Sequence, residues 1–379
     1  MKHGIQMVLL FSVLFGLSNC KKPENDILYN KKYIKEIKAA RKDLGYYLGS
    51  NFIPGASIAV MKDGELIYSE GIGYASKDLD VRANRSTKFR IGNTSELFTN
   101  VIYQKLVEEG ILHPDSSVQH YYPEFPEKAY KITVNDLAQQ ISGIRDPNSN
   151  ETNQQGLNVK LEKGLEQVIN EPLKTPPGVY QTTGFFNYNL LGVVMKKATQ
   201  MSYSKLLEKY VTDTLNLSNT VMDNPFLTIK NRSDFYDQNY IAQVVNETTR
   251  DLRYRSPSDG LLSNAEDLAK LGNTILNSDY LSEETRANLW QAIPLYNDIP
   301  SQVANAWMLL IDNEGNKIYG KAGSVSGGSS SLVIYPDENL IVAFACNLTM
   351  PTDKTPIFNV AKYFLPNGFE KETTANDEK

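Results

Sequence analysis

The chain has 379 residues, of which 41% are hydrophobic and 22% are charged, and its formal net charge at pH 7 is -5. This length suits one large domain or two closely associated ones. The acidic balance argues against nucleic acid as a partner. The three histidines and two cysteines offer few candidates for a metal site or a histidine-dependent triad, so we expect no cofactor.

The N-terminal residues have the pattern of a signal peptide. A short basic start precedes a mostly apolar run, 5–17, which is too short to span a bilayer comfortably. The next letters, LSNC, resemble a bacterial lipobox, in which Cys20 is acylated and becomes the mature N-terminus. We therefore expect a signal peptide at 1–19, a lipid-anchored tether at 20–30, and a cell-envelope location on the periplasmic or outer-membrane face. The alternative is an ordinary secretory signal with an incidental cysteine.

The elements of the folded part follow in chain order. Two strands are predicted in 57–68, with a turn at Asp63-Gly64 between them. A helix is predicted at about 95–109, with apolar side chains on one face and Gly110 as its stop. The pattern over about 111–255 is helical with long loops, and strand patterns return at 306–312, 317–320, 331–335 and 340–346.

Strands at both ends of the chain imply that the two ends pair in one sheet with a helical part inserted between them. We expect an α/β fold, an antiparallel sheet flanked by helices, with a pocket where the two parts meet. The domain is predicted at 31–368, with its sheet part at about 31–110 and 256–368 and its helical part at about 111–255. The polar end, 369–379, is predicted to be a disordered tail.

The segment 89–99, FRIGNTSELFT, resembles a motif of the penicillin-recognising serine hydrolases, the family of class C-type β-lactamases, D,D-peptidases and related esterases. Family members read roughly F-x-x-G-S-x-S-K-x-F-T. Further landmarks follow in the family's order: Leu106–Gly110, Ile141–Ile144, Pro177-Gly178, Leu190–Gly192 and Gly260–Leu268. The resemblance covers roughly 30–350 and implies a β-lactamase/transpeptidase-like fold.

The resemblance also implies a chemistry, and most of its residues are replaced here. In the family a serine is acylated, a lysine three residues on takes its proton, a Tyr-x-Asn relays protons, and a Lys-x-Gly lines the opposite wall. The alignment puts Asn93 at the nucleophile, Glu96 at the base and Thr183-Gly184-Phe185 at the Tyr-x-Asn position. Only Lys321-Ala322-Gly323 is retained. Because Asn is no nucleophile, we expect the family mechanism not to operate.

A structural role explains Asn93 and Glu96 without any chemistry. Asn is among the best N-cap residues, and an acid three residues later can bond back to the cap's own N–H. We therefore expect these two residues to cap the helix. The alternative is that Glu96 activates a water molecule directly.

Three other serine segments are candidate nucleophiles, each with a feature against it. Ser95 keeps the family's second serine, but no lysine lies three residues on. Ser202 and Lys205 match the S-x-x-K spacing but fall where relatives carry a surface helix. The segment 323–327, GSVSG, is not G-x-S-x-G and is expected to be a loop.

Binding can persist where catalysis is lost. The resemblance implies an oxyanion hole formed by the backbone N–H groups of Asn93 and Ser324. It also implies that Lys321 pairs with a ligand carboxylate. The predicted binding residues are Lys321, Ala322, Gly323, Ser324 and Ser95.

The sequence thus predicts a catalytically silent, membrane-tethered relative that binds a peptidoglycan-derived peptide, another carboxylate ligand or a protein partner. One alternative is an active serine hydrolase with rearranged catalytic residues. Another is a purely structural surface protein with a closed pocket, in which Phe185 and Phe186 would fill the cleft.

Overall fold

The computed structural model describes residues 26–152, 160–248, 250–312 and 314–366. The predicted signal peptide, Cys20 and the predicted tail at 369–379 lie outside the described residues. Strand β1 (Ile27–Tyr29) pairs with the edge of the sheet, so the folded part begins inside the segment predicted to be a tether.

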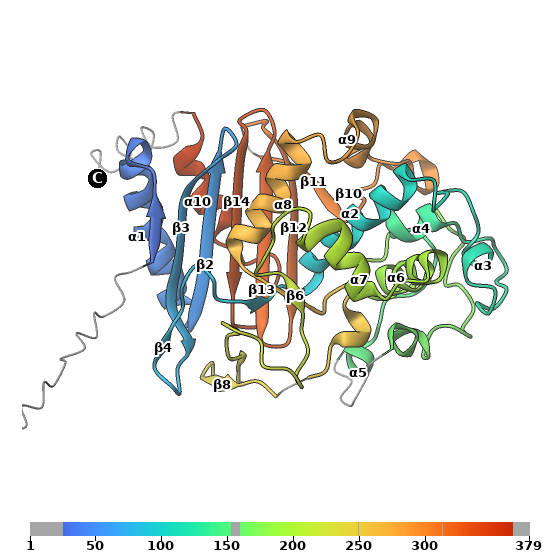
Figure 1. The fold of residues 1–379 in the computed structure, drawn as a ribbon, viewed down its shortest axis with the longest axis horizontal. Helices are drawn as coiled ribbons and strands as arrows, with labels where there is room; N and C mark the ends of the chain where they lie inside the picture. The colour runs from blue at the N-terminus through green and yellow to red at the C-terminus, as the bar shows by residue number, and fades with distance from the viewer. Residues whose placement is uncertain (1–25, 153–159, 249, 313, 367–379) are drawn as a thin grey trace, which may run out of the picture.

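A nine-stranded antiparallel sheet forms the centre of the molecule (Figure 1). Its strand order is β1-β3-β2-β14-β13-β12-β11-β10, and β4 pairs with β3. The strands are β2 (Gly55–Lys62), β3 (Glu65–Ser76), β4 (Val81–Arg82), β10 (Val303–Ala304), β11 (Trp307–Ile311), β12 (Lys317–Val325), β13 (Gly328–Tyr335) and β14 (Leu340–Cys346). Strand β2 lies beside β14, with Val60 opposite Val342. The predicted pairing of the two chain ends is confirmed.

The first hairpin forms where the turn chemistry predicts it. Strands β2 and β3 are joined by Asp63 and Gly64, whose φ angles of 53° and 81° are both in the left-handed region. A two-residue turn with two positive φ angles matches the twist of antiparallel strands, and Asp-Gly is a favoured pair for it.

Helices cover both faces of the sheet because β2 alternates its apolar side chains between two cores. Ile58 and Val60 pack with α1 (Ile34–Ser50) and α10 (Ile357–Ala361), whereas Ala59 and Met61 pack with α8 (Ala265–Asn277) on the opposite face. A strand with period-2 apolar residues on both sides is buried on both faces.

The helical part lies beside the β10–β12 end of the sheet (Figure 1). Its helices are α2 (Ser95–Glu108), α3 (Val118–Tyr121), α4 (Val134–Ala138), α5 (Ser149–Thr152), α6 (Phe186–Thr199), α7 (Tyr203–Leu207) and α9 (Glu283–Leu289). Two small sheets accompany them, β5 (Phe89–Arg90), β9 (Leu261–Ser263) and β6 (Val221–Met222), and the pair β7 (Tyr236–Gln238) and β8 (Val244–Asn246). The helix predicted at 95–109 is confirmed, and Gly110 follows it with φ 68°.

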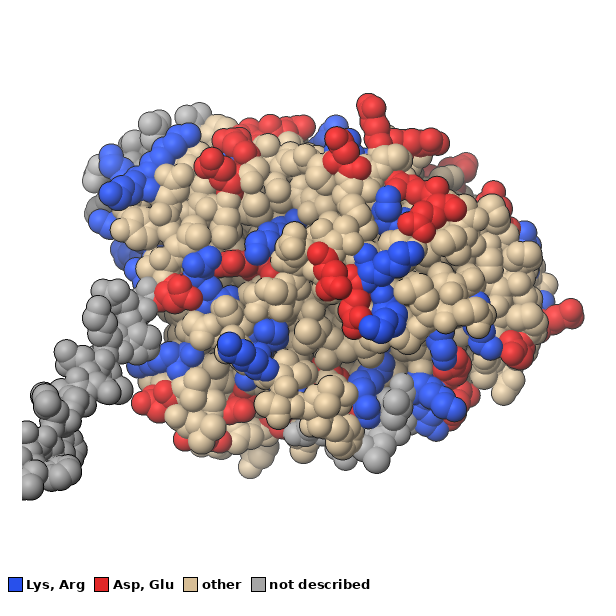
Figure 2. All heavy atoms as spheres, viewed as in Figure 1, with Lys and Arg blue, Asp and Glu red and all other residues tan. Residues whose placement is uncertain are grey.

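Basic and acidic side chains are interspersed over the face shown in Figure 2. This distribution agrees with the small net charge of -5. No helix in the described ranges is both long and apolar enough to cross a membrane.

Candidate functional site

Two backbone segments are in direct contact where the sheet joins the helical part. Gly323 of β12 lies against the 3₁₀-helix η2 (Gly92–Thr94), which leads directly into α2. A Cβ atom at Gly323 would lie 2.3 Å from the carbonyl oxygen of Ile91 and 2.7 Å from the amide nitrogen of Asn93. Only glycine allows this approach, which brings the nucleophile position to the strand that carries Lys321.

A cleft of about 400 Å³ opens at this junction. It is lined by Asn93, Thr183, Val303, Met308, Lys321, Ala322, Thr352 and Asp353. Two larger cavities, of about 520 and 670 Å³, lie elsewhere and contain none of the predicted site residues. We therefore take the smaller cleft as the candidate site, since four predicted residues from three separate segments converge there.

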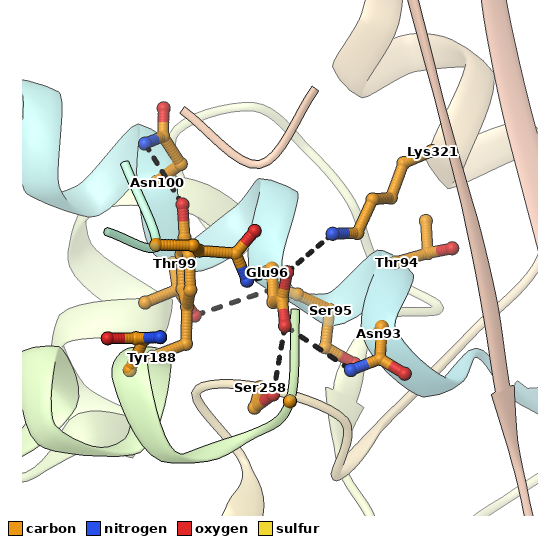
Figure 3. Close-up of polar contacts among 12 residues, drawn as sticks. Asn93, Thr94, Ser95, Glu96, Thr99, Asn100, Tyr188, Ser258 and Lys321 are labelled. Atoms are coloured by element: carbon orange, nitrogen blue, oxygen red, sulfur yellow. Dashed lines mark hydrogen bonds and ion pairs between the residues drawn. The ribbon is translucent and has the colours of Figure 1, made fainter. Parts of the chain in front are cut away.

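Beside this cleft, Glu96 is fully buried and accepts four hydrogen bonds (Figure 3). The Lys321 Nζ atom lies 2.5 Å from its Oε2 atom, and the side-chain amide of Gln140 donates to the same oxygen at 3.1 Å. Its Oε1 atom accepts from the hydroxyl of Ser258 at 3.0 Å and from the amide of Asn93 at 3.3 Å. Both carboxylate oxygens are thus held by two donors each.

The electrostatics of Glu96 depend on Lys321. Burial raises the pKa of Glu96 above its usual range, because desolvation disfavours the charged form. The attraction and hydrogen bond of Lys321 act in the opposite direction, as do the hydrogen bonds of Asn93 and Ser258. The positive charge of Lys321 is in turn matched within the protein by Glu96.

The chain matches the family model "Beta-lactamase" over residues 35–360. It belongs to this family. The human mitochondrial "Serine beta-lactamase-like protein LACTB" is 28% identical over 405 residues, covering 78% of this chain and 73% of that protein. "Protein flp" of Staphylococcus aureus is 26% identical over 309 residues, covering 79% of this chain and 61% of that protein.

Solved structures show the same fold. FmtA from Staphylococcus aureus has a TM-score of 0.74 at 21% identity, with 90% of this chain and 93% of that chain covered. A class C β-lactamase has a TM-score of 0.72 at 18% identity, with coverage of 88% and 97%. The expected β-lactamase/transpeptidase-like fold is therefore confirmed.

The predicted helix cap is wrong. Helix α2 has Thr94 at its N-cap position, in helical conformation and with no capping hydrogen bond from its side chain. The 3₁₀-turn η2 comes first and displaces the start of the helix, so Asn93 sits inside a helical turn. The side chains of Asn93 and Glu96 bond to each other and not to the backbone of a cap. Tertiary partners, chiefly Lys321, decide their conformation.

The serines of the family motif and the candidate motifs have structural partners. Ser95 is fully buried, and its hydroxyl accepts from the backbone N–H of Leu261 at 3.3 Å, so it does not line the cleft as predicted. Ser202 caps α7 by accepting from the backbone N–H of Lys205. Ser324 lies in β12, so the loop predicted at 323–327 is wrong for residues 323–325, and the hydroxyl of Ser324 accepts from Ser329 at 3.3 Å.

The two adjacent phenylalanines do not fill the cleft. Phe185 and Phe186 are buried in the core of the helical part, with ring centroids 4.5 Å apart. Thr183 of the same segment lines the cleft instead. The closed pocket that a purely structural protein would show is therefore not the arrangement found.

Sequence reasoning missed Gln140 and Ser258. Both are fully buried polar side chains and both bond to Glu96. Each lies one or two residues from a landmark of the family, 141–144 and 260–268, and this adjacency was the available signal. Within the part of the chain that the structure describes, no three His, Cys, Asp or Glu side chains are placed to hold a metal ion.

Proposed function

We propose that this protein is a catalytically silent, lipid-anchored member of the family that binds a ligand in the cleft. The observation that carries the proposal is the buried ion pair of Glu96 with Lys321 at 2.5 Å. In this arrangement the base position is a carboxylate that is already saturated with donors. The nucleophile position is an amide that serves as one of them.

The hydroxyls that line the cleft offer no replacement nucleophile. They belong to Thr183 and Thr352, and neither forms a hydrogen bond with a lysine, histidine or carboxylate within the described ranges. An alcohol at its ordinary pKa needs such a base to attack a carbonyl group. Acylation by the family route is therefore not expected.

The lining of the cleft favours a peptide-like ligand. Asn93, Thr183 and Thr352 supply neutral hydrogen-bonding groups, Asp353 supplies a carboxylate, and Val303 and Met308 supply apolar surface. Small-ligand sites commonly combine these features. We propose a peptidoglycan-derived peptide as the ligand, with a segment of a partner protein as the alternative occupant. A ligand carboxylate near Lys321 would meet an ammonium whose charge is already matched by Glu96.

Intact-protein mass spectrometry tests catalytic silence. The full chain is exposed to penicillins, cephalosporins and a fluorophosphonate, alongside a family member that carries the serine and lysine. We expect no mass shift while the reference protein is labelled completely. A stoichiometric adduct mapped to one serine would overturn silence and establish the competing function, an active hydrolase with rearranged residues.

Calorimetry with soluble peptidoglycan fragments tests binding. Thr183→Trp places a large side chain at the cleft and should abolish the heat of binding. Thr248→Trp changes an exposed threonine outside the cleft and should leave it intact. Equal binding by both variants would place the ligand elsewhere, and no heat with any fragment would favour a protein partner.

A further inference from the structure

Four large apolar side chains project into solvent from three loops at one end of the sheet. Phe52 follows α1 and is 59% exposed, and Leu79 lies in the turn between β3 and β4 and is 74% exposed. Tyr240 and Ile241 form the tip of the β7–β8 hairpin and are 98% and 57% exposed. We call these four residues the apolar rim.

Side-chain hydrogen bonds join the three loops. Gln238, next to the hairpin tip, donates to the backbone carbonyl of Asn51, which adjoins Phe52, at 3.0 Å. Asn246 of β8 donates to Asp78, which adjoins Leu79, at 2.7 Å. Figure 1 shows β4 and β8 together at the lower edge of the molecule. The rim is therefore one surface feature drawn from segments far apart in the sequence.

Phe52 holds its aromatic side chain in the rim from a left-handed backbone position. Its φ of 55° is in the left-handed region, where a bulky residue is an outlier. Phe52 ends α1 at a position that glycine usually occupies, and its N–H donates to the carbonyl of Gly49. Phe52 is one of thirteen non-glycine residues with positive φ in the described ranges, and at 59% exposure most of its side chain is accessible at the surface.

The start of the described chain runs toward the same end of the sheet. Ile27 pairs with Glu70 and Tyr29 with Tyr68, so the N-terminal end of β1 is the end nearer to Ser76 and the β3–β4 turn. Six residues, Lys21 to Asp26, separate Cys20 from β1. Fully extended, they reach about 20 Å. The six steps along β3 from Glu70 to Ser76 are about equally long, at about 3.3 Å per step.

A tether of this length limits the distance between the β3–β4 end of the sheet and the membrane surface to which an acylated Cys20 would be anchored. The charges near the rim are of mixed sign, with Lys77 and Arg82 beside Asp78 and Asp80. The lower edge in Figure 2 likewise shows both signs separated by uncharged side chains. A bilayer would therefore be met through apolar and aromatic contact, which suits the headgroup region, and not through a basic patch.

We propose that the apolar rim docks onto the bilayer surface that carries the lipid anchor, with Tyr240 and Ile241 inserted at headgroup level. This inference rests on the proposed acylation of Cys20. It adds an orientation to the tether: the β4–β8 end of the domain faces the membrane, and the opposite end of the sheet faces away.

Fluorescence quenching in vesicles tests the orientation. The full-length protein is isolated with its lipid and reconstituted in phosphatidylcholine vesicles whose chains are brominated. Tyr240→Trp places a reporter in the rim, and Tyr296→Trp is the matched control, since Tyr296 is 62% exposed and lies in the loop before β10. The wild-type emission of Trp290 and Trp307 is subtracted from both.

We expect the brominated lipid to quench the fluorescence of Tyr240→Trp strongly and to leave that of Tyr296→Trp unchanged. The quenching of Tyr240→Trp should persist at an ionic strength of about 0.5 M, at which charge attraction is largely screened. Equal quenching of both reporters, or of neither, would overturn the proposal. The mass of the N-terminal peptide reports separately whether Cys20 carries a diacylglyceryl group. If Cys20 is lipidated but the Tyr240→Trp reporter is not quenched, docking by the apolar rim is rejected and the lipid anchor stands. If the reporter is quenched but Cys20 carries no lipid, the lipid anchor is rejected and membrane contact by the rim stands.

A substitution at Phe52 separates docking from folding. Phe52→Gly relieves the positive φ, so the urea midpoint should hold or rise. In the Tyr240→Trp background the same change should reduce the quenching by bromolipid. A lowered urea midpoint with unchanged quenching would assign Phe52 to the fold and remove it from the rim.

Discussion

Two segments of this chain have the spacing of a family nucleophile and its base, and they lie in opposite environments. In 93–96, both residues are of the wrong type, yet the segment is buried beside the cleft and bonded to Lys321. In 202–205, serine and lysine are both present, yet Ser202 caps a short surface helix and Lys205 pairs with Glu208 in solvent. The position of a segment in the fold therefore identifies the candidate site. The S-x-x-K motif alone does not, because it is present at 202–205, which lies outside the cleft.

The two segments also differ in how tightly their side chains are held. The Lys205 and Glu208 side chains are 66% and 47% exposed, so their attraction is screened and worth little. The side chains of Lys321 and Glu96 are 6% and 0% exposed, and the removal of one partner leaves an uncompensated charge in the interior. Substitutions at matched positions should therefore have very different effects.

The largest effect is expected from Lys321→Met. It leaves Glu96 buried without its ammonium partner and should lower the free energy of unfolding by about 3–5 kcal/mol, measured by urea denaturation. The double variant Glu96→Gln/Lys321→Met removes both charges and should recover part of this loss. Lys205→Met, the surface control, should leave the urea curve in place. If Lys321→Met were as stable as the wild type, the ion pair of Lys321 with Glu96 would not contribute to the stability of the fold.

Gly323→Ala should be the next most damaging change. Its Cβ would lie 2.3 Å from the carbonyl oxygen of Ile91, so β12 and η2 must separate. We expect a loss of about 1–3 kcal/mol from overpacking together with loss of ligand binding. Gly49→Ala in α1 is the control, since a Cβ there meets nothing within 4 Å and should be neutral or stabilising. Equal stability of Gly323→Ala and Gly49→Ala would contradict the close approach of β12 to η2.

The pH dependence of stability sharpens the contrast further. Since the pKa of Glu96 is raised in the folded state, its protonated form is favoured by folding. The stability of the wild type relative to Glu96→Gln should be greatest below about pH 4. It should fall as the pH rises through the raised pKa, by at most about 1.4 kcal/mol per pH unit. In Lys321→Met the fall should extend to higher pH, because the interaction that lowers this pKa is gone.

The smallest effect is expected at the intact motif. Ser202→Ala removes the cap of α7 and should cost about 1 kcal/mol, seen as a small shift of the urea midpoint. It should change neither labelling by fluorophosphonate nor ligand binding. If Ser202→Ala abolished a hydrolase activity, the catalytic site would lie at 202–205 on the surface and not at the cleft beside Glu96.

Much of the fold could be predicted from the sequence, because local signals and tertiary demands agree there. Asp63-Gly64 has the turn chemistry of a hairpin, and the run at 340–346 has the apolar pattern of a strand buried on both faces. The position of the cleft could also be predicted, since the ordered landmarks brought Asn93, Thr183 and Lys321 to one place.

The roles of the residues at the cleft could not be predicted, because they depend on distant partners. Asn93 and Glu96 fit a helix cap by local preference, but Lys321, 225 residues beyond Glu96, draws the carboxylate into the interior. Gln140 and Ser258 complete its coordination from two further loops. Local propensity predicts the low-energy choice for an isolated helix, and burial overrides it here.

The pairing of β2 with β14 has a consequence for the order in which the molecule can be assembled. Val60 and Val342, partners at the middle of the sheet, are 282 residues apart in the sequence. The two halves of the sheet therefore cannot join until nearly the whole chain has been synthesised, and contacts of such long range form slowly. Until then β2 has an open edge on its β14 side, which is a template for aggregation. We therefore expect no stable N-terminal fragment, and any truncation before residue 340 should leave the chain unable to fold.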